Sequence, residues 1–432
     1  MNPYIEKILS VFKFKDLRSR ILITAAILLL VRVLAHIPLP GVNLEVLRQF
    51  FAQNQVFGLL NLFSGGTFEN FSIILMGVGP YITASIIMQL LTHVIPSLET
   101  LSKEGEYGQR RINQYTRILT VPLSAIQGYA MISVLSKQAG NLSIQIAGFD
   151  LLSAIVVVTA GCVFLMWLGE IISESGIGNG ISLIITLGII AGFPTGIRNT
   201  LALLTQGGVQ SSLVFGLIGF VILTLAAVYL IVFITEAQRN IPVSYARRVR
   251  GQRMVGGVES YLPLRVNQAG VIPIIFAMAI LIFPTTLFKF FQNVKSEWLS
   301  NAANWITNTL QNNWVYGVSY FVLVIAFTYF YTAIVFNPQQ IAENLQKQGG
   351  FIPGIRPGSE TIGYLKKILN RVTLWGAVFL AAIAVLPFVV QSVTGITTLV
   401  IGGTGILIIV SVLLETGRQI RAQLLIRTYD SY

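Results

Sequence analysis

Charged residues are scarce in this chain. They make up only 11% of its 432 residues, whereas 54% of the residues are hydrophobic. A soluble domain carries about 25% charged residues, so the composition excludes an ordinary soluble protein. The charges that are present cluster between long apolar runs, each near the ~20 residues that a helix needs to cross a bilayer. The composition therefore predicts an all-α polytopic membrane protein.

Cysteine and histidine are also nearly absent. Cys162 is the single cysteine, so no internal disulfide can form. His36 and His93 lie near span ends, far from any acidic cluster, and suit the membrane boundary better than a metal site. GIGNG at 176–180 is a short turn between membrane helices, and GGTG at 402–405 lacks the lysine of a phosphate-binding loop. We therefore expect no enzyme, no metal and no cofactor.

Ionisable side chains are almost missing from the predicted membrane interior. Arg32 lies toward one end of the first span, and the nearest glutamates lie at span ends: Glu170, Glu174, Glu236 and Glu415. A secondary transporter of small solutes usually needs charged groups inside its spans. An intramembrane protease needs a nucleophile with a basic partner at that depth. The sequence disfavours both alternatives.

Ten apolar runs are predicted to span the membrane: 21–39, 73–95, 118–136, 151–169, 181–197, 213–235, 270–288, 315–336, 372–391 and 397–415. Of the 29 lysines and arginines, 23 lie in the N-terminal segment, the even-numbered loops and the C-terminal tail, and 5 lie in the odd-numbered loops. Because basic loops stay in the cytoplasm, both termini are predicted to be cytoplasmic.

The spans divide into two halves of five. The N-terminal half covers residues 1–197 and the C-terminal half covers 213–432, with a hinge loop over 198–212 between them. An odd number of spans in each half inverts the second half relative to the first. Inverted halves place a pathway at their interface, near the middle of the membrane.

Two predicted cytoplasmic loops are long, 236–269 and 337–371. The first contains six arginines, and the second contains FIPGIRPG at 351–358. Prolines and glycines at this density are turn chemistry, so we expect ordered hairpins that project into the cytoplasm. The basic charge alone fits a topology signal, but the length and the turns favour a docking surface for a cytoplasmic partner.

A half-polar stretch, FSGGTFENF at 63–71, precedes the second span. Its residues suit the start of a short helix more than a lipid-facing segment, although a simple loop with close helix packing is the plainer interpretation. Two interpretations are also open for a set of apolar residues in four spans: Val78, Ile82, Ile185, Ile275 and Ile408. They suit ordinary packing, or a hydrophobic constriction that blocks water and ions by dewetting.

Five long stretches carry a resemblance that runs over nearly the whole chain: FSGGTFENFSIILMGVGPYITASIIMQLL (63–91), EGEYGQRRINQYTR (104–117), MWLGEIISESGIGNGIS (166–182), LPLRVNQAGVIPIIFA (262–277) and FNPQQIAENLQKQGGFIPGIRPG (336–358). In their length and order they resemble the SecY/Sec61-alpha family, the central channel subunits of Sec protein translocases. The resemblance implies ten transmembrane helices in two inverted five-helix halves around a central hourglass pore, with a short plug helix at about 61–72.

The resemblance also implies roles for individual residues. The pore ring would consist of Val78, Ile82, Ile185, Ile275 and Ile408. Val78 stands where isoleucine is commoner in the family, so the ring is expected to be slightly wider there. The plug would contain Asn61, Phe63, Ser64, Gly65, Gly66, Thr67, Phe68, Glu69 and Asn70. Polar residues of a lateral gate, between spans two and three and spans seven and eight, would be Thr83, Gln127 and Asn267.

The function implied by the resemblance is a passive conduit for unfolded secretory polypeptides, which releases hydrophobic segments sideways into lipid. Arg247, Arg248, Arg250 and Arg356 would bind the SecA motor ATPase and the ribosome. The other implied partners are the SecE and SecG subunits and membrane lipids, and the implied location is the bacterial plasma membrane. Energy would come from the partners, since the chain has no nucleotide site. A secondary transporter remains the alternative.

Overall fold

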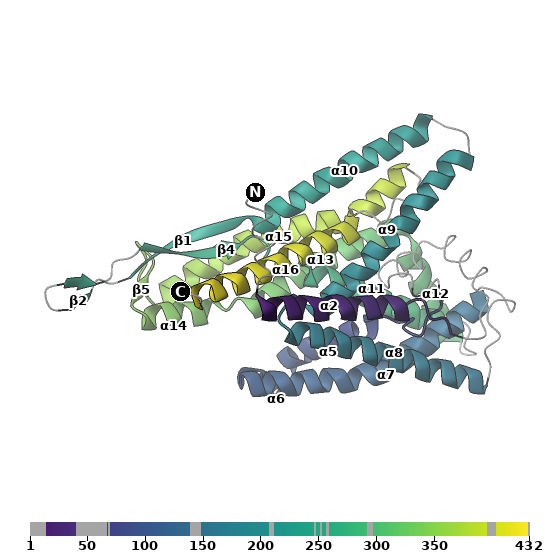
Figure 1. The fold of residues 1–432 in the computed structure, drawn as a ribbon, viewed down its shortest axis with the longest axis horizontal. Helices are drawn as coiled ribbons and strands as arrows, with labels where there is room; N and C mark the ends of the chain where they lie inside the picture. Colours follow the sequence, from purple (N-terminus) through teal and green to yellow (C-terminus); the bar gives the residue numbers. More distant parts are fainter. Residues whose placement is uncertain are drawn as a thin grey trace.

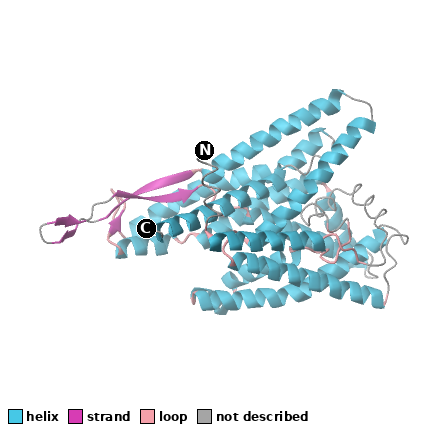
Figure 2. Cartoon of the chain, viewed as in Figure 1, coloured by secondary structure: helices cyan, strands magenta, loops and turns pink. Residues whose placement is uncertain are grey.

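The computed structural model describes residues 14–39, 67, 70–138, 148–206, 211–245, 248–250, 253–255, 259–291, 297–394 and 403–430, and these are mostly helical (Figure 2). The helices are α2 (Lys15–Leu34), α5 (Gly79–Val94), α6 (Pro96–Lys103), α7 (Glu106–Gln138), α8 (Phe149–Glu174), α9 (Gly180–Gln206), α10 (Ser211–Glu236), α11 (Ile272–Phe291), α12 (Glu297–Gln311), α13 (Asn313–Val335), α14 (Pro338–Lys347), α15 (Ser359–Thr394) and α16 (Gly403–Asp430). The strands are β1 (Gln238–Tyr245), β2 (Arg248–Arg250), β3 (Arg253–Val255), β4 (Glu259–Arg265) and β5 (Gly350–Phe351).

Each of the ten predicted spans overlaps one long helix of the described chain: α2, α5, α7, α8, α9, α10, α11, α13, α15 and α16. Within the described residues, Phe149–Glu174, Trp314–Lys347 and Ser359–Val389 are each long and apolar enough on their own to cross a membrane. Helices α5 and α6 together also pass this test, but the chain bends by 100° between them, where Pro96 begins α6. The apolar runs of the sequence thus became helices, as their composition predicts.

Several helices run beyond the apolar segments. Helix α7 begins at Glu106, well before the predicted span, and an ion pair of 2.7 Å between Glu106 and Arg110 supports this exposed first turn. The predicted hinge loop over 198–212 is mostly helix, because α9 continues to Gln206 and α10 begins at Ser211. The residues after Pro194 include several good helix formers and no further proline, so nothing ends α9 earlier.

The long helices run alongside one another and share one hydrophobic core (Figure 1). Its buried members come from both halves, for example Ile86 of α5, Ile189 of α9, Phe276 of α11 and Leu407 of α16. Helix α11 packs against α5 and α7, and α16 packs against α9. The two halves therefore meet along at least two lines of contact, and the candidate site lies between these lines.

A small sheet extends beyond one end of the helix bundle (Figure 1). Strands β1 and β4 form the antiparallel hairpin expected in the loop 236–269, and β5 pairs with the other edge of β1. The loop 337–371 is not a second hairpin. It folds as α14 and β5, because Asn337 caps α14 by accepting hydrogen bonds from two backbone N–H groups and Pro338 suits the first helical position.

This projecting unit has its own core. Ile241 of β1 and Leu264 of β4 are buried against Ala342 of α14, Ile352 and Leu365 of α15. Alternate residues of β1 are buried and exposed, as expected for a strand with one covered face. The unit therefore has a core of its own, separate from the core of the helix bundle.

Helix α12 was not predicted. It lies in the connection between α11 and α13, packs against both, and carries Trp298 and Trp305 on its exposed side. Trp314, at the start of α13, is exposed beside it. Because tryptophan gathers at the boundary between membrane and water, these three side chains mark that boundary at the end of the bundle opposite the sheet.

Candidate functional site

All five predicted ring residues belong to the hydrophobic core that the two halves share. Ile185 of α9, Ile275 of α11 and Ile408 of α16 are buried in the shared core, as is Val78 directly before α5, and Ile82 of α5 packs against them half-buried. Two of the contributing helices belong to the first half of the chain and two to the second. An all-apolar cluster thus sits where the halves meet.

Val78 reaches this cluster because the chain does not enter α5 directly. Residues 73–78 form a series of turns, and Gly77 has φ +55°, a conformation in which a residue with a side chain is strained. Pro80 then suits the first turn of α5, where its missing N–H is not needed. The predicted second span therefore becomes a helix only from Gly79 onward.

A small cavity of about 30 Å³ lies beside Val78 and Ile185. Thr67, Ala35 and Arg32 also line it, so it joins α2 and the segment before α5 to the apolar cluster. A cavity of this size holds about one water molecule when polar partners are present. The apolar cluster is thus tightly packed on this side.

Most predicted plug residues lie outside the described part of the chain: Asn61, Phe63, Ser64, Gly65, Gly66, Phe68 and Glu69. Thr67 is buried, and its hydroxyl donates to the carbonyl oxygen of Leu75 at 3.2 Å. The Asn70 side-chain amide donates to the carbonyl oxygen of Ala35 at 3.4 Å. These contacts fix the end of the predicted plug against the end of α2.

The predicted plug helix does not extend to residue 72. Residues 70–72 form a turn and a β-bridge, in which Ser72 pairs with Pro38. The backbone N–H of Leu39 donates to the carbonyl oxygen of Phe71, so pairing with the segment after α2 replaces helical hydrogen bonds. Phe71 is fully buried with φ 43°, a strained value for a bulky residue. Packing of this ring holds the strained backbone in place.

We call the junction of α5 and α7 with α11 and α13 the gate seam. Thr83 of α5 is buried, and its hydroxyl donates within its own helix to the carbonyl oxygen of Gly79 at 3.1 Å. Gln127 of α7 and Asn267, just before α11, are also buried. The Nε2 of Gln127 and the Oδ1 of Asn267 lack a hydrogen-bond partner among the described residues.

One aromatic contact crosses the gate seam. His93, near the end of α5, meets Phe330 of α13 edge to face, with ring centroids 5.4 Å apart. Phe276 of α11 makes similar contacts with Phe327 and Tyr331 of α13, at 6.1 and 6.4 Å, and these join the two helices on one side of the seam. Such pairs contribute about 0.5–1.5 kcal/mol beyond area burial. Across the gate seam itself, the described contacts are therefore helix packing and the His93–Phe330 pair.

The halves are joined differently at residues 175–180, the loop between α8 and α9. Gln419 of α16 accepts a hydrogen bond of 2.7 Å from the backbone N–H of Gly178, and Gln423 donates one of 2.6 Å to the carbonyl oxygen of Gly176. Arg20 of α2 donates to the carbonyl oxygen of Ser175. We call this loop and its partners the clasp.

Glycine is required in the clasp. Gly176 and Gly178 have φ near +75°, and a Cβ on Gly178 would lie 2.8 Å from the hydroxyl oxygen of Thr416. A Cβ on Gly180 would overlap the carbonyl oxygen of Gly169. In the GIGNG motif, Gly178 thus allows close packing between the halves, and Gly180 allows close packing of α9 on α8. In the sequence, the signal that could have pointed to the partners of this loop was the spacing of Gln419 and Gln423, which places both on one face of α16.

The predicted docking arginines lie at two places on the projecting unit. Arg247 is outside the described residues, and Arg248 and Arg250 lie on β2, at the far tip in Figure 1. Arg356 is exposed on the turn after β5, where its carbonyl oxygen accepts a hydrogen bond of 2.9 Å from Thr361. Buried Ile352 anchors the same turn. The chain therefore presents Arg356 on a rigid turn and Arg248 and Arg250 on a separate hairpin.

These features define a class of protein: a polytopic helical membrane protein whose two halves share an apolar core. The halves are joined by apolar packing at the gate seam and by hydrogen bonds at the clasp. A family model described as SecY matches residues 72–417. The chain belongs to the SecY family.

Curated relatives agree over nearly the full length. The chain is 44% identical to a protein translocase subunit SecY of Thermus thermophilus over 429 residues, which covers 98% of this chain and 96% of the relative. It is 42% identical to a subunit of the same description from Streptomyces coelicolor, covering 98% of each. These relatives give no support to a secondary transporter of small solutes.

Solved structures show the same fold. A structure of a protein-conducting channel matches 93% of this chain and 91% of its own, with a TM-score of 0.62 and 19% identity. Sec61 in a canine ribosome–channel complex matches over the same shares, with a TM-score of 0.61 and 18% identity. The arrangement of helices is therefore that of Sec-type channels.

Proposed function

We propose that this chain is the channel subunit that passes unfolded secretory polypeptides across the bacterial plasma membrane. The observation that supports this proposal is that the predicted collar residues all lie in the apolar core shared by the two halves: Val78, Ile82, Ile185, Ile275 and Ile408. Such a collar closes against water and ions by dewetting. It also yields to an extended chain of any sequence, because it offers no specific hydrogen bond that one substrate would need.

The gate seam supports sideways release. Opening it separates ring contacts and exposes Gln127 and Asn267, whose unpaired atoms gain water or a substrate partner. A segment in the open seam then partitions by composition. Each central leucine or isoleucine favours the membrane by roughly 0.3–0.6 kcal/mol, and a central charge disfavours it by roughly 2.5–3.5 kcal/mol. Over about 20 residues this difference selects sideways release or forward passage.

The plug segment would rest against the collar. Thr67 supports this placement, because it lines the same small cavity as Val78 and Ile185. The bonds from Thr67 and Asn70 tether the end of the segment near α2, so the remainder at 61–66 would swing about a fixed base. The two halves would hinge about the connection between α9 and α10 while the clasp stays closed.

The energy for transport would come from partners, and this chain would carry no catalytic step. The basic projecting unit supports a cytoplasmic docking role for the SecA motor ATPase and the ribosome, and by the positive-inside rule its charge supports a cytoplasmic location of both termini. One similar structure is described as part of a ribosome–channel complex. SecE and SecG would complete the membrane assembly.

Site-specific photocrosslinking tests the conduit. Photoreactive residues at Ile82 and Ile275, in a channel jammed by an arrested secretory chain, should both crosslink to that chain. Ile222 of α10, which is exposed on the outside of the bundle, is the matched control and should not react with it. Arrest without a crosslink at either ring position would show that the collar is not the pathway.

A charge reversal tests the docking role separately. Arg356→Glu should abolish motor-driven uptake of precursor by membrane vesicles while leaving the chain inserted. Arg356 is exposed, and the hydrogen bond from Thr361 is accepted by its backbone carbonyl oxygen, which the substitution keeps. Lys347→Glu, on exposed helix α14 of the same unit, controls for charge alone. Normal uptake by vesicles with the Arg356→Glu variant would contradict the docking proposal but would not affect the proposal that the chain is a conduit.

A further inference from the structure

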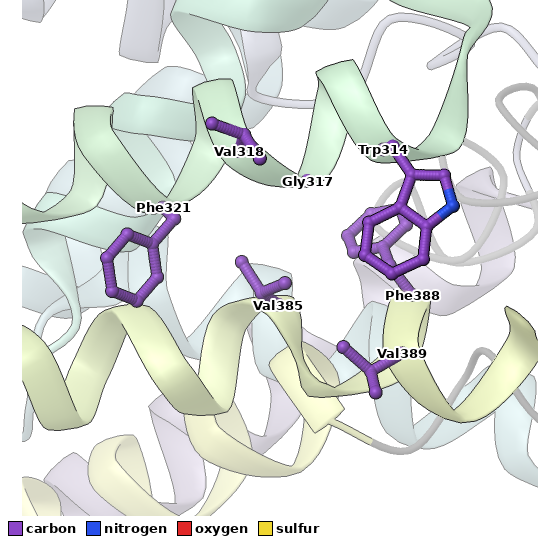
Figure 3. Close-up of a pocket in the computed structure, with 7 residues that line it drawn as sticks. All are labelled: Trp314, Gly317, Val318, Phe321, Val385, Phe388 and Val389. Atoms are coloured by element: carbon purple, nitrogen blue, oxygen red, sulfur yellow. The ribbon is translucent and has the colours of Figure 1, made fainter. Parts of the chain in front are cut away.

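An apolar pocket that none of the predicted ring residues lines lies at the surface of the bundle. It has a volume of about 220 Å³ and opens between α13 and α15 (Figure 3). Its lining residues are Trp314, Gly317, Val318, Phe321, Val385, Phe388 and Val389. The indole N–H of Trp314 is the one polar side-chain group in this set. The pocket therefore suits a hydrocarbon ligand.

The pocket is built into the packing of the two helices. Gly317 carries no side chain, and a Cβ there would already lie 3.6 Å from Val385. Pro387 interrupts the backbone hydrogen bonds of α15 beside it. On the inner side, the ring of Phe388 is held by Tyr316 and Tyr320, with centroid distances of 5.2 and 6.4 Å. Since its walls are fixed by packing, the pocket exists before any ligand enters.

The depth of the pocket identifies its surroundings. Trp314, at its rim, lies at the membrane boundary marked also by Trp298 and Trp305. The other lining residues lie further along α13 and α15, inside segments that are each long and apolar enough to cross a membrane. Val318 and Val389 are exposed at the mouth. Hydrocarbon is the solvent at that depth, and water would find almost no partner there.

We propose that this pocket binds one acyl chain of a membrane phospholipid, with the headgroup at the level of Trp314. The acyl chain fills a void that would otherwise leave its walls without contacts. The indole ring, which is apolar on its faces and polar at its N–H, suits the boundary between chain and headgroup. This proposal needs only that α13 and α15 lie in a membrane, so it is independent of the transport function.

Photolabelling tests the proposal. The complete translocase complex is placed in vesicles of phosphatidylethanolamine and phosphatidylglycerol, doped with a phosphatidylglycerol that carries a diazirine in its acyl chain. After illumination, lipid adducts should concentrate on the peptides that contain residues 314–321 and 385–389. Gly317→Leu should reduce these adducts to the level found on the outer face of α10.

Two controls keep the test decisive. Gly219→Leu makes the same substitution on exposed α10, where a Cβ would meet nothing within 4 Å, and should leave the labelling unchanged. Val389→Phe blocks the mouth without touching Gly317, and should repeat the loss if Gly317→Leu folds poorly. Equal labelling in all variants would overturn the proposal. So would crosslinking of a photoreactive residue at Val318 to another polypeptide in place of lipid.

Discussion

The gate seam and the clasp both join the first half of the chain to the second, but they do so through different kinds of contact. At the gate seam, ring contacts and apolar packing dominate, and Gln127 and Asn267 each leave a buried atom unpaired. At the clasp, Gln419 and Gln423 bond directly to the backbone of the 175–180 loop. The clasp is not fully satisfied either, since Thr416 Oγ1 and Gln423 Oε1 lack partners among the described residues.

Because their contacts differ, the two junctions are expected to behave differently when the channel opens. Ring and apolar contacts have no fixed partner atoms, so they can be exchanged for contacts with lipid or with an apolar segment of a substrate. The hydrogen bonds of the clasp need partner atoms in fixed positions, and breaking them leaves partly buried polar groups unpaired. The molecule is therefore expected to open at the gate seam while the clasp stays closed.

The largest expected effect comes from crowding the clasp. Gly178→Ala would place a Cβ 2.8 Å from the Thr416 hydroxyl of α16, across the junction, and overpacking of this kind costs about 1–3 kcal/mol. Gly105→Ala is a matched control, because Gly105 has the same φ of +73° but a Cβ there meets nothing within 4 Å. Thermal unfolding of the purified complex should show a larger fall in midpoint for Gly178→Ala than for Gly105→Ala. Equal falls would show that the clasp tolerates the extra atom and does not hold the halves tightly.

The next effect comes from removing the unpaired polar atoms of the gate seam. Each buried unpaired group costs about 1–3 kcal/mol, and replacing both by apolar groups of similar size removes that cost. The double variant Gln127→Leu, Asn267→Leu should therefore stabilise the closed seam and slow the uptake of a precursor with a weakly hydrophobic signal sequence.

The control for this pair is Thr83→Val. The Thr83 hydroxyl bonds within its own helix, so its loss should change uptake little. Initial uptake rates by membrane vesicles measure all three proteins. If the leucine pair speeds uptake, the polar atoms stabilise the closed seam and the comparison between the two junctions fails.

The sequence predicts what depends on local pattern. Apolar length predicts each of the ten long helices, and the hairpin expected in the long loop 236–269 forms as β1 and β4. The turn-rich stretch 351–358 led us to expect a second hairpin, which is not formed. Boundaries depend on tertiary contacts and were predicted less well. The segment before α5 pairs with residues after α2, so the second helix starts at Gly79 and residues 70–72 are not helical.

The residues of the candidate site also divide into those that could be predicted from the sequence and those that depend on tertiary contacts. The apolar collar came from a family resemblance; its members lie in the shared core, and their role as a collar stays a proposal. The clasp was out of reach because Gly178 and Gln419 are 241 residues apart. No local pattern pairs them. A glycine-rich turn and two glutamines on one helix face become a contact only after the bundle has formed.

The smallest expected effect concerns the ring contact at the end of the gate seam. His93→Ala removes the edge-to-face contact with Phe330, and such contacts contribute about 0.5–1.5 kcal/mol beyond area burial. Uptake of a precursor with a weak signal sequence should therefore rise by up to about tenfold. A double-mutant cycle with Phe330→Ala isolates the pair, since the second substitution should add little once the first is present. Simple additivity would mean that the two rings do not couple, and that α5 and α13 are held closed by packing elsewhere along the seam.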